Sequence, residues 1–351
     1  MAYDMKKWLS DLKKSPVKKA MPVLSFPSVQ LMGISVRDLI SDSGNQARGM
    51  KLVAERVDAC AAVSMMDLSV EAEAFGSQIR ISDDEVPTVT GRIIATEEDA
   101  RALAVPEVGK GRTGLYIEAI AEAVRLITDR PVFAGVIGPY SLAGRLMDVS
   151  EIMVNCYTEP DMVHIVMRKA TDFIIAYIKG YRKTGAGGVV IAEPLAGLLS
   201  PELMENFAAP YMKEIVDAVQ TDDFLVIYHN CGNNTITLID HILAAGASAY
   251  HFGNAVSMEE MLARVPSDTV VMGNIDPASQ FRNGTPESIR KATLDLLQAC
   301  SKYPNFIISS GCDIPPFAKW ENIDAFIKAV NDFYAGRTRH SAHKKEAAVV
   351  G

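Results

Sequence analysis

The sequence has no excess of basic residues. Its 35 lysines and arginines are outnumbered by 43 aspartates and glutamates, which gives a formal net charge of −8. Proteins that bind nucleic acid usually carry a basic stripe or patch. The charge balance therefore argues against a nucleic-acid partner.

Long apolar runs and a dense cysteine framework are also missing. No hydrophobic segment reaches the roughly 18 to 20 apolar residues that a membrane span needs, and the residues after Met1 do not read as a cleavable signal. The five cysteines show none of the even, close spacing of disulfide-rich secreted domains. We therefore expect a protein of the reducing cytoplasm with no membrane association.

What the chain does have is length and apolar content. At 351 residues and 48% hydrophobic, it can build one large core. A (β/α)₈ barrel typically takes about 250 residues, which leaves room for additions at both ends. We predict a helical cap in the lysine-rich residues 1–20, a catalytic barrel over 21–335 and a polar tail over 336–351.

Short apolar runs alternate with helical segments along most of the chain. Repeated strand–helix units indicate a parallel sheet, and eight of them favour closure into a (β/α)₈ TIM-type barrel of the α/β class. Residues 76–112 are expected to leave this repeat as an irregular excursion over the barrel mouth. The predicted strands lie within Pro22–Pro27, Ala61–Leu68, Pro131–Gly138, Gly188–Glu193, Phe224–Gly232, Ala249–Gly253, Val270–Asp276 and Phe306–Cys312.

An imidazole and a thiol stand two residues apart where the fifth predicted strand ends. Side chains alternate along a strand, so His229 and Cys231 project to the same side, and Cys312 follows the eighth strand in a matching setting. One His and two Cys are donors that suit zinc. Buried cysteines are more often inert, but functional side chains of such barrels gather at the carboxyl ends of the strands.

Further polar residues occupy strand ends. Three of them are candidates for the same mouth: Glu193 at the end of strand four, and Asn274 and Asp276 at the end of strand seven. His251 on strand six suits either the mouth or the core. Carboxylates after strand two, including Asp67, fit either a substrate-facing rim or a solvated loop. Three other cysteines fall in helices or at their ends, where packing explains them: Cys60, Cys156 and Cys300.

Three motifs in this order resemble the zinc-dependent methyltransferase branch of the uroporphyrinogen decarboxylase superfamily, which includes the methylcobamide:coenzyme M methyltransferases. The resemblance runs from about residue 60 to 335. Weaker support comes from Met66–Gly76 and Gly138–Leu142. The motifs are His229-Asn-Cys-Gly232, Gly273-Asn-Ile-Asp-Pro277 and Ser310-Gly-Cys-Asp-Ile-Pro315, the last followed by Glu321-Asn322.

The resemblance implies a distorted barrel that binds Zn²⁺ through His229, Cys231 and Cys312. It also implies a methylated corrinoid such as methylcobalamin as methyl donor, a corrinoid carrier protein as partner and a small-molecule methyl acceptor, with coenzyme M as the nearest example. It is compatible with a homo-oligomer. Decarboxylases of the superfamily carry an arginine-rich N-terminal motif, which Ser25–Gly33 lacks, so porphyrinogen decarboxylation is disfavoured.

The donor set itself favours alkyl transfer. Two thiolates cancel the charge of zinc, so the ion is a weaker electrophile than in a three-imidazole hydrolytic site. A thiol that binds the ion still loses its proton, and the resulting thiolate is suited to attack a methyl group.

Several roles stay open. Glu193 is predicted either as a fourth ligand that the acceptor displaces or as a carboxylate that orients His229, while Asn274 and Asp276 are expected to shape loops or orient substrate. Tetrahydrofolate is an alternative acceptor, and demethylation of a methoxy or methylamine compound onto cob(I)alamin is the reverse reaction. A zinc hydrolase and a structural zinc protein are the alternatives from other classes. Candidate arginines for a sulfonate are Arg80, Arg92 and Arg145.

Overall fold

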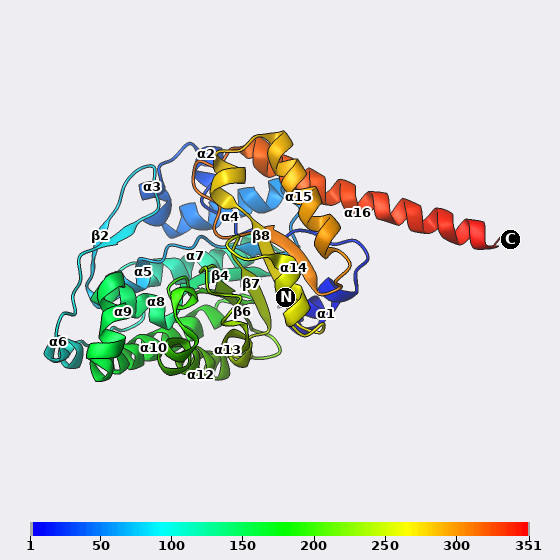
Figure 1. The fold of residues 1–351 in the computed structure, drawn as a ribbon. Helices are drawn as coiled ribbons and strands as arrows, with labels where there is room; N and C mark the ends of the chain where they lie inside the picture. The colour runs from blue at the N-terminus through cyan, green and yellow to red at the C-terminus, as the bar shows by residue number, and fades with distance from the viewer. Residues whose placement is uncertain (1–2, 350–351) are drawn as a thin grey trace.

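Seven parallel strands form one curled sheet, and helices surround it (Figure 1). The structure is a computed structural model that describes the backbone of residues 3–349 and the side chains of residues 3–337. In sheet order, the strands are β1 (Ala62–Val63), β4 (Val132–Ile137), β5 (Gly188–Ala192), β6 (Leu225–Asn230), β7 (Ala249–Phe252), β8 (Val270–Ile275) and β9 (Phe306–Ser310). The predicted α/β barrel is confirmed, with seven regular strands in place of eight.

The first predicted strand, Pro22–Pro27, is not a regular strand in this structure. The extended backbone before it nevertheless bridges the two ends of the sheet: the Met21 amide donates to the carbonyl of Ile308 (3.0 Å), and the Cys60 amide donates to the carbonyl of Ala20 (2.9 Å). Proline has no N–H to donate to a ladder, which explains why pairing stops at this point. The segment fills the eighth position and makes the barrel distorted.

Helices cover the outside of the barrel, and a first hydrophobic core lies between the two layers. The long helix α10 (Pro160–Arg182) illustrates the packing, because four fully buried residues recur along it at helical spacing: Val163, Met167, Ala170 and Ile174. The covering helices include α4 (Ser43–Arg56), α7 (Thr113–Leu126), α8 (Pro139–Met147), α9 (Val149–Thr158), α10 (Pro160–Arg182), α12 (Ala209–Val219), α13 (Ile239–Ala244), α14 (Met258–Arg264), α15 (Pro286–Cys300) and α16 (Trp320–Val349).

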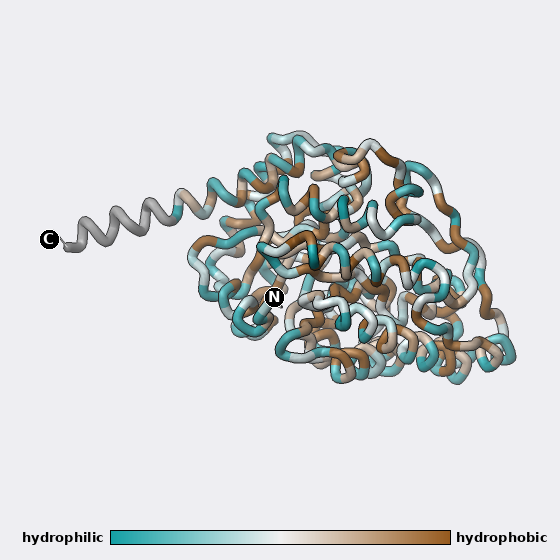
Figure 2. The backbone as a smooth tube through the Cα atoms, turned by 180° about the vertical axis from the view of Figure 1, so that it is seen from behind, coloured by the Kyte–Doolittle hydropathy of each residue, from teal (hydrophilic) through white to brown (hydrophobic). Residues whose placement is uncertain are grey.

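A second hydrophobic core fills the barrel interior, and helix α1 (Met5–Lys14) closes it from the amino-terminal end. Met5 and Leu12 of α1 belong to this inner core, and the ring of Trp8 lies 5.4 Å from that of Phe133 on β4. Asp4 caps the helix by accepting a hydrogen bond from the Lys7 amide. The predicted N-terminal helical cap is thus confirmed. Hydrophobic stretches alternate with hydrophilic ones along the surrounding helices (Figure 2).

Shorter elements connect the layers. The predicted excursion over residues 76–112 contains an antiparallel hairpin and a short helix. The remaining elements are α2 (Ser28–Met32), α3 (Val36–Ile40), α5 (Val70–Phe75), β2 (Gln78–Arg80), β3 (Thr88–Thr90), α6 (Glu97–Ala102), η1 (Ala196–Leu198), α11 (Pro201–Leu203) and the π-helical turns η2 (Met204–Ala208) and η3 (Pro277–Arg282).

Helix α16 continues past the predicted domain boundary at residue 336 and projects from the body (Figure 1). The predicted tail is therefore helical up to Val349, and its last two residues lie outside the described part of the chain. The boundary itself stays a prediction. Among the described residues, no helix combines the length and the apolar character needed to cross a bilayer.

Candidate metal centre

The alternation of side chains along β6 brings His229 to the inside of the barrel. Leu225 and Ile227 of this strand belong to the inner core, while Val226 and Tyr228 belong to the outer core. Because successive side chains point to opposite faces, His229 continues the inward series. Cys231, two residues further on, follows it just past the end of the strand.

The structure brings together the three predicted metal ligands. One donor atom from each of His229, Cys231 and Cys312 lies within 4.8 Å of the other two. In a tetrahedral zinc site with Zn–N of about 2.0–2.1 Å and Zn–S of about 2.3 Å, donor atoms stand roughly 3.5–3.8 Å apart. A small contraction of the cluster therefore accommodates the ion. His229 Nε2 is buried and has no hydrogen-bond partner among the described residues. A metal ligand would have this property.

A hydrogen-bond chain fixes the tautomer of His229. The hydroxyl of Ser309 donates to the carbonyl of Met21 (2.6 Å), so its oxygen accepts from Nε2 of His251 (2.8 Å). Nδ1 of His251 is then an acceptor and receives the Nδ1 proton of His229 across 2.7 Å. This assignment leaves a lone pair on His229 Nε2, the nitrogen that faces the cluster.

His251 itself stays neutral. Burial, and to a smaller extent the neighbouring His229, holds the pKa of His251 well below its ordinary value. The sequence of strand six alone is compatible with His251 at the mouth or in the core. The β6–β7 register puts it directly beside His229, a relation that pairing of the strands creates and the sequence of either strand alone does not contain.

Cys231 and Cys312 share a hydrogen bond that shifts their pKa values in opposite directions. The contact with Cys312 lowers the pKa of Cys231, whereas the same contact and burial raise the pKa of Cys312 to about 12. Cys231 is therefore the more acidic of the two thiols. A divalent ion would favour the thiolate form of both cysteines, so metal binding and proton release would be coupled.

The structure does not bring Glu193 to this cluster. Ala192 belongs to the inner core, so the next side chain points outward, toward helix α8. Its Oε2 accepts from the Tyr140 amide (3.0 Å) and its Oε1 from the Ser141 amide (2.6 Å). Burial raises the pKa of Glu193 to about 7. In this arrangement Glu193 is neither a fourth ligand nor a partner of the His229 ring, contrary to both predicted roles; it binds the free amides at the start of α8.

Asn274 and Asp276 shape loops. The Asn274 amide donates to the carbonyls of Gly253 (3.0 Å) and Val256 (2.8 Å). Asp276 Oδ1 accepts from the amides of Ala278 (2.8 Å) and Ser279, which begin η3. These contacts correspond to the predicted role in shaping loops, the alternative having been to orient substrate.

A cavity of about 230 Å³ opens onto the cluster. His229, Cys231 and Cys312 all line it, together with Asp313. Most of the remaining wall is apolar, including Phe26, Met66, Leu68, Val86 and Ile314. Val86 comes from the excursion over residues 76–112, which therefore contributes to the mouth as predicted.

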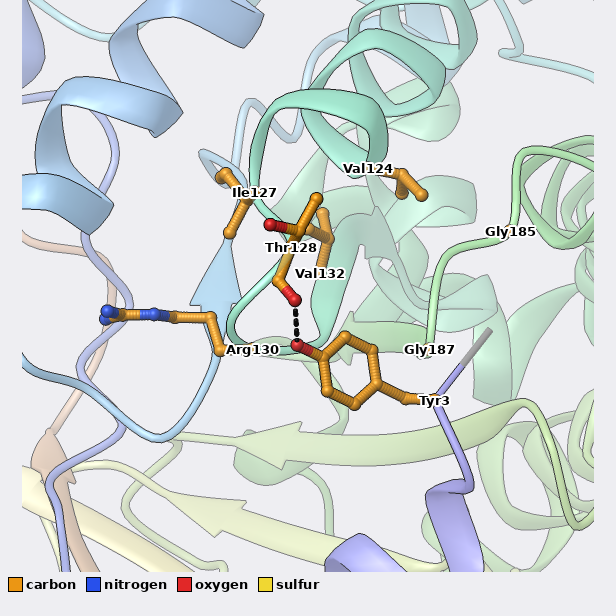
Figure 3. Close-up of a pocket in the computed structure, with 8 residues that line it drawn as sticks. All are labelled: Tyr3, Val124, Ile127, Thr128, Arg130, Val132, Gly185 and Gly187. Carbon is orange, nitrogen blue, oxygen red and sulfur yellow. Dashed lines mark hydrogen bonds between the residues drawn. The ribbon is translucent and has the colours of Figure 1, made fainter. Parts of the chain in front are cut away.

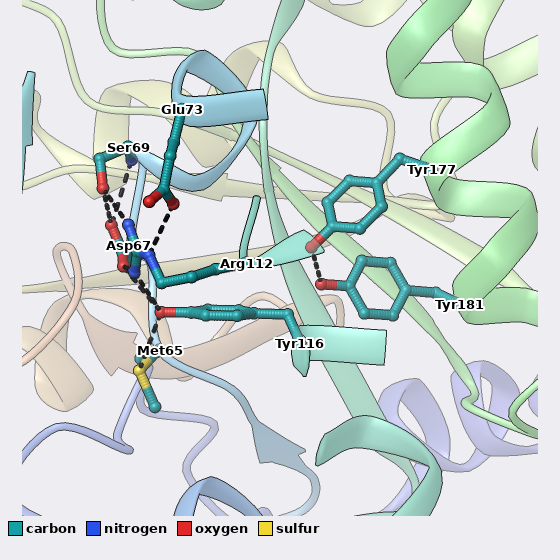
Figure 4. A network of polar contacts seen from close by, with 8 residues as sticks. All are labelled: Met65, Asp67, Ser69, Glu73, Arg112, Tyr116, Tyr177 and Tyr181. Atoms are coloured by element: carbon teal, nitrogen blue, oxygen red, sulfur yellow. Dashed lines mark hydrogen bonds and ion pairs between the residues drawn. The ribbon is translucent and has the colours of Figure 1, made fainter. Parts of the chain in front are cut away.

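A buried ion network anchors that excursion to the end of β1 (Figure 4). The guanidinium of Arg112 binds the carboxylates of Asp67 and Glu73, the latter at 2.7 Å, and donates to the hydroxyl of Ser69 (2.9 Å). The hydroxyl of Tyr116 also donates to Asp67, at 2.7 Å. Asp67 therefore faces neither substrate nor solvent, because its charge is compensated inside the protein.

A larger cavity, of about 500 Å³, lies at the opposite, amino-terminal end of the barrel (Figure 3). Two of its polar side chains already have partners: the hydroxyl of Tyr3 donates to the carbonyl of Thr128 (2.7 Å), and Arg130 binds Asp129 and the carbonyl of Val57. Catalytic groups of such barrels lie at the other end. The metal cluster therefore marks the candidate active site.

Fold and site together define a TIM-type barrel with a His–Cys–Cys cluster at the carboxyl ends of its strands. The sequence profile of the uroporphyrinogen decarboxylase (URO-D) family matches residues 14–333. The chain belongs to this family, as the resemblance predicted.

The chain is similar both to methyltransferases and to uroporphyrinogen decarboxylases. The methylcobamide:CoM methyltransferase MtbA of Methanosarcina acetivorans is 28% identical over 277 residues, which are 76% of this chain and 78% of that protein. The uroporphyrinogen decarboxylase of Coxiella burnetii is 26% identical over 285 residues, or 78% and 77% of the two chains. A solved methyltransferase from Methanosarcina mazei shares the fold, with a TM-score of 0.81 at 23% identity over 95% of this chain and 99% of its own. The predicted likeness to the methyltransferase branch is confirmed.

Proposed function

We propose that this protein is a corrinoid-dependent methyltransferase that passes a methyl group from a methylated corrinoid, held by a carrier protein, to a zinc-activated acceptor thiol. The named methyltransferase relatives support the reaction class. The observation that carries the finer proposal is the cluster of His229, Cys231 and Cys312 at the barrel mouth, with a free lone pair on His229 Nε2. Zinc bound there would supply the positive charge that keeps an acceptor thiol deprotonated at neutral pH.

Residues of the chain orient the imidazole of His229 and set the charge and polarity around the ion. His251 and Ser309 hold His229 in the tautomer that presents Nε2. With zinc bound, Cys231 and Cys312 would contribute two negative charges, which would limit the electrophilicity of the ion and leave the acceptor sulfur electron-rich. The mostly apolar wall of the cavity would surround the reacting sulfur.

The reaction balances as a methyl cation transfer. The acceptor thiol loses its proton to solvent, and its sulfur lone pair forms the new S–C bond. The Co–C bond breaks with both electrons remaining on cobalt, so methyl-Co(III) becomes Co(I). No external oxidant or reductant is needed.

Uroporphyrinogen decarboxylation is not favoured. One decarboxylase is similar to this chain at 26% identity, but Ser25–Gly33 contains no arginine that would bind porphyrinogen carboxylates. The carboxylate of Asp67, which follows β1, is also occupied, since it is bound by Arg112 and Tyr116.

The test is to mix zinc-loaded protein with methylcobalamin and follow the cobalt absorbance after adding thiols, tetrahydrofolate or no acceptor. We expect demethylation with a thiol, and its loss in the Cys312→Ser variant but not in the control Cys60→Ser, whose thiol lies outside the cluster. Demethylation with tetrahydrofolate alone, or thiol-dependent turnover in Cys312→Ser, would overturn the proposal.

A further inference from the structure

The two thiols of the metal cluster belong to strands that are not neighbours. Cys231 follows β6 and Cys312 follows β9, and β7 and β8 lie between these strands in the sheet. Adjacent strands stand about 4.8 Å apart, so three spacings separate β6 from β9 by about 14 Å along the sheet. The two sulfur atoms nevertheless lie within 4.8 Å of each other. The thiols therefore meet over the ends of the two intervening strands.

The last inward positions of these two strands are Gly253 and Asn274. Ala249 of β7 and Met272 of β8 belong to the inner core. Because side chains alternate along a strand, the inward series of β7 continues to Gly253, just past the strand end, and that of β8 continues to Asn274. What stands at these two positions therefore decides how closely the thiols can approach each other.

Gly253 lies directly against Cys231. The β6–β7 pairing joins Asn230 to Phe252, and the next residue of each strand is Cys231 and Gly253. A Cβ on Gly253 would overlap the Cβ of Cys231 and stand 2.6 Å from its Cα, closer than real Cβ atoms approach. A side chain at this position would therefore displace either Cys231 or the end of β7.

The segment Gly253–Asn254 also touches the backbone that carries Cys312. A Cβ on Gly253 would lie 3.3 Å from the carbonyl oxygen of Gly311, and a Cβ on Gly311 would lie 2.8 Å from the amide nitrogen of Asn254. Gly311 is itself held, since its amide donates to the carbonyl of Ile275 (2.6 Å). Gly253–Asn254 thus forms a spacer between the chain segments of the two thiols, and a shift of the spacer away from one thiol moves it toward the other.

Cys231 has little room on its other side. A Cβ on Gly232, the next residue, would lie 2.6 Å from the Cα of Gly197 in η1. Gly197 is fixed in turn, because its carbonyl accepts from the amide of Asn234 (2.9 Å). A group added at Gly253 therefore cannot be absorbed by moving Cys231 toward η1.

Asn274 holds the spacer in place. Its side-chain amide donates to the carbonyls of Gly253 (3.0 Å) and Val256 (2.8 Å). The amide of Gly253 donates to the carbonyl of Asn230 (3.1 Å), so the spacer is bonded from both neighbouring strands. The same bonds direct the Asn274 amide to the connection after β7 and not into the cluster.

We infer that Gly253 and Asn274 are positioning residues for the metal centre. Gly253 keeps the space between the two thiols clear, and Asn274 holds the spacer where Cys231 and Cys312 can share one ion. Metal sites need such support, because donor atoms must be held within about 0.5 Å of the productive geometry. The inference rests on the metal centre of the proposed function and does not depend on methyl transfer.

Gly253→Ala tests the first role. We expect its zinc affinity, measured by competition with a chromophoric chelator, to fall by at least about tenfold. Co²⁺ in place of zinc supplies a spectroscopic signature, because thiolate-to-cobalt charge-transfer absorbance increases with the number of bound thiolates. This absorbance should fall by about half, since one of two thiolates is lost. The control is Gly187→Ala, which adds a Cβ 3.1 Å from that of Pro131 at the amino-terminal end of the barrel and should retain the affinity and both thiolates.

Asn274→Ala tests the second role without adding volume. Loss of its two hydrogen bonds should lower zinc affinity by about tenfold. Asn305→Ala is the matched control, because the buried Asn305 amide also donates to two carbonyls, those of Pro266 (3.4 Å) and Thr269 (2.8 Å), at the start of β9. It should destabilise the fold to a similar extent in urea and leave zinc affinity unchanged.

The outcomes separate the inference from the proposed function. Wild-type zinc affinity and cobalt absorbance in Gly253→Ala, or equal affinities in Asn274→Ala and Asn305→Ala, would overturn the inference. If Gly253→Ala does not fold, as judged by circular dichroism, the comparison of the two asparagine variants decides alone. Unsubstituted protein that binds zinc but never demethylates methylcobalamin contradicts the proposed function and leaves the inference standing. Unsubstituted protein that binds no zinc overturns both.

Discussion

The Nδ1 atoms of His229 and His251 lie 2.7 Å apart, and the hydrogen bond between them connects the metal cluster to the closure of the barrel. His251 bonds to Ser309 on β9, which bonds to Met21 in the segment that fills the eighth position. Two features of the fold, the cluster at the mouth and the irregular bridge between β9 and β1, therefore meet in one chain of contacts.

Replacing His251 with Phe should weaken zinc binding. The ring volume is kept, but His229 Nδ1 loses its acceptor and the tautomer is no longer fixed. Loss of such an outer partner typically costs about 10- to 100-fold in metal affinity. Competition with a chromophoric chelator measures the change. The control is His164→Phe, since His164 bonds to Tyr211 outside the site; equal affinities in both variants would contradict the assigned role of His251.

Removal of a direct ligand should have the larger effect. Cys231→Ser or Cys312→Ser is expected to lower zinc affinity by more than the roughly 100-fold upper limit for outer partners, whereas Cys60→Ser should retain one equivalent of zinc. Zinc content after dialysis against a weak chelator gives the answer. Retention of zinc by either cluster variant would exclude that cysteine as a ligand.

Glu193→Ala should destabilise the fold without removing zinc. The substitution leaves the amides of Tyr140 and Ser141 at the start of α8 buried and unpaired, at about 1–3 kcal/mol for each. Urea unfolding measures the loss, and the same preparation is assayed for zinc. A variant of unchanged stability that has lost its zinc would restore Glu193 as a ligand.

Arg112→Met should be among the most destabilising single changes. It leaves the buried Asp67 without its counterion, and breaking a buried pair in this way typically costs about 3–5 kcal/mol. Arg101→Gln is the control, because its pair with Glu97 is exposed and should contribute at most about 1 kcal/mol. Similar urea midpoints for the two variants would argue against a structural role for the network.

Stability should fall as pH rises from about 5 to 7, in part because of Glu71. Burial raises the pKa of this carboxyl from 4.5 to about 7, so the folded protein holds a proton that the unfolded chain has already released in this range. The stabilisation is complete below the unfolded pKa and is lost through the folded pKa, amounting to on the order of 3 kcal/mol. Glu71→Gln should flatten the dependence of urea midpoints on pH; an unchanged slope would contradict it.

The barrel and the clustering of His229, Cys231 and Cys312 could be predicted because both follow from the pattern of strands along the chain. Apolar runs mark the strands, and the two-residue spacing of His229 and Cys231 guarantees a common face. The same rule, applied to β5, would have shown that Glu193 lies opposite to the inward Ala192. A polar residue at a strand end faces the mouth only where the alternation of side chains directs it inward.

Other features depend on pairing between distant segments. The partnership of His229 with His251 requires the β6–β7 register, and the bridge made by Met21 requires β9 to lie beside it. Asp313 follows Cys312 directly in the sequence, but its place in the cavity wall depends on the packing of distant segments around it.

X-ray absorption at the zinc edge of the purified protein tests most directly whether three distant donors converge on one ion. We expect one zinc per chain, with two sulfur neighbours at about 2.3 Å and at least one nitrogen at about 2.0–2.1 Å, falling to one sulfur in Cys312→Ser. A first shell that contains only nitrogen and oxygen would contradict the His229–Cys231–Cys312 centre.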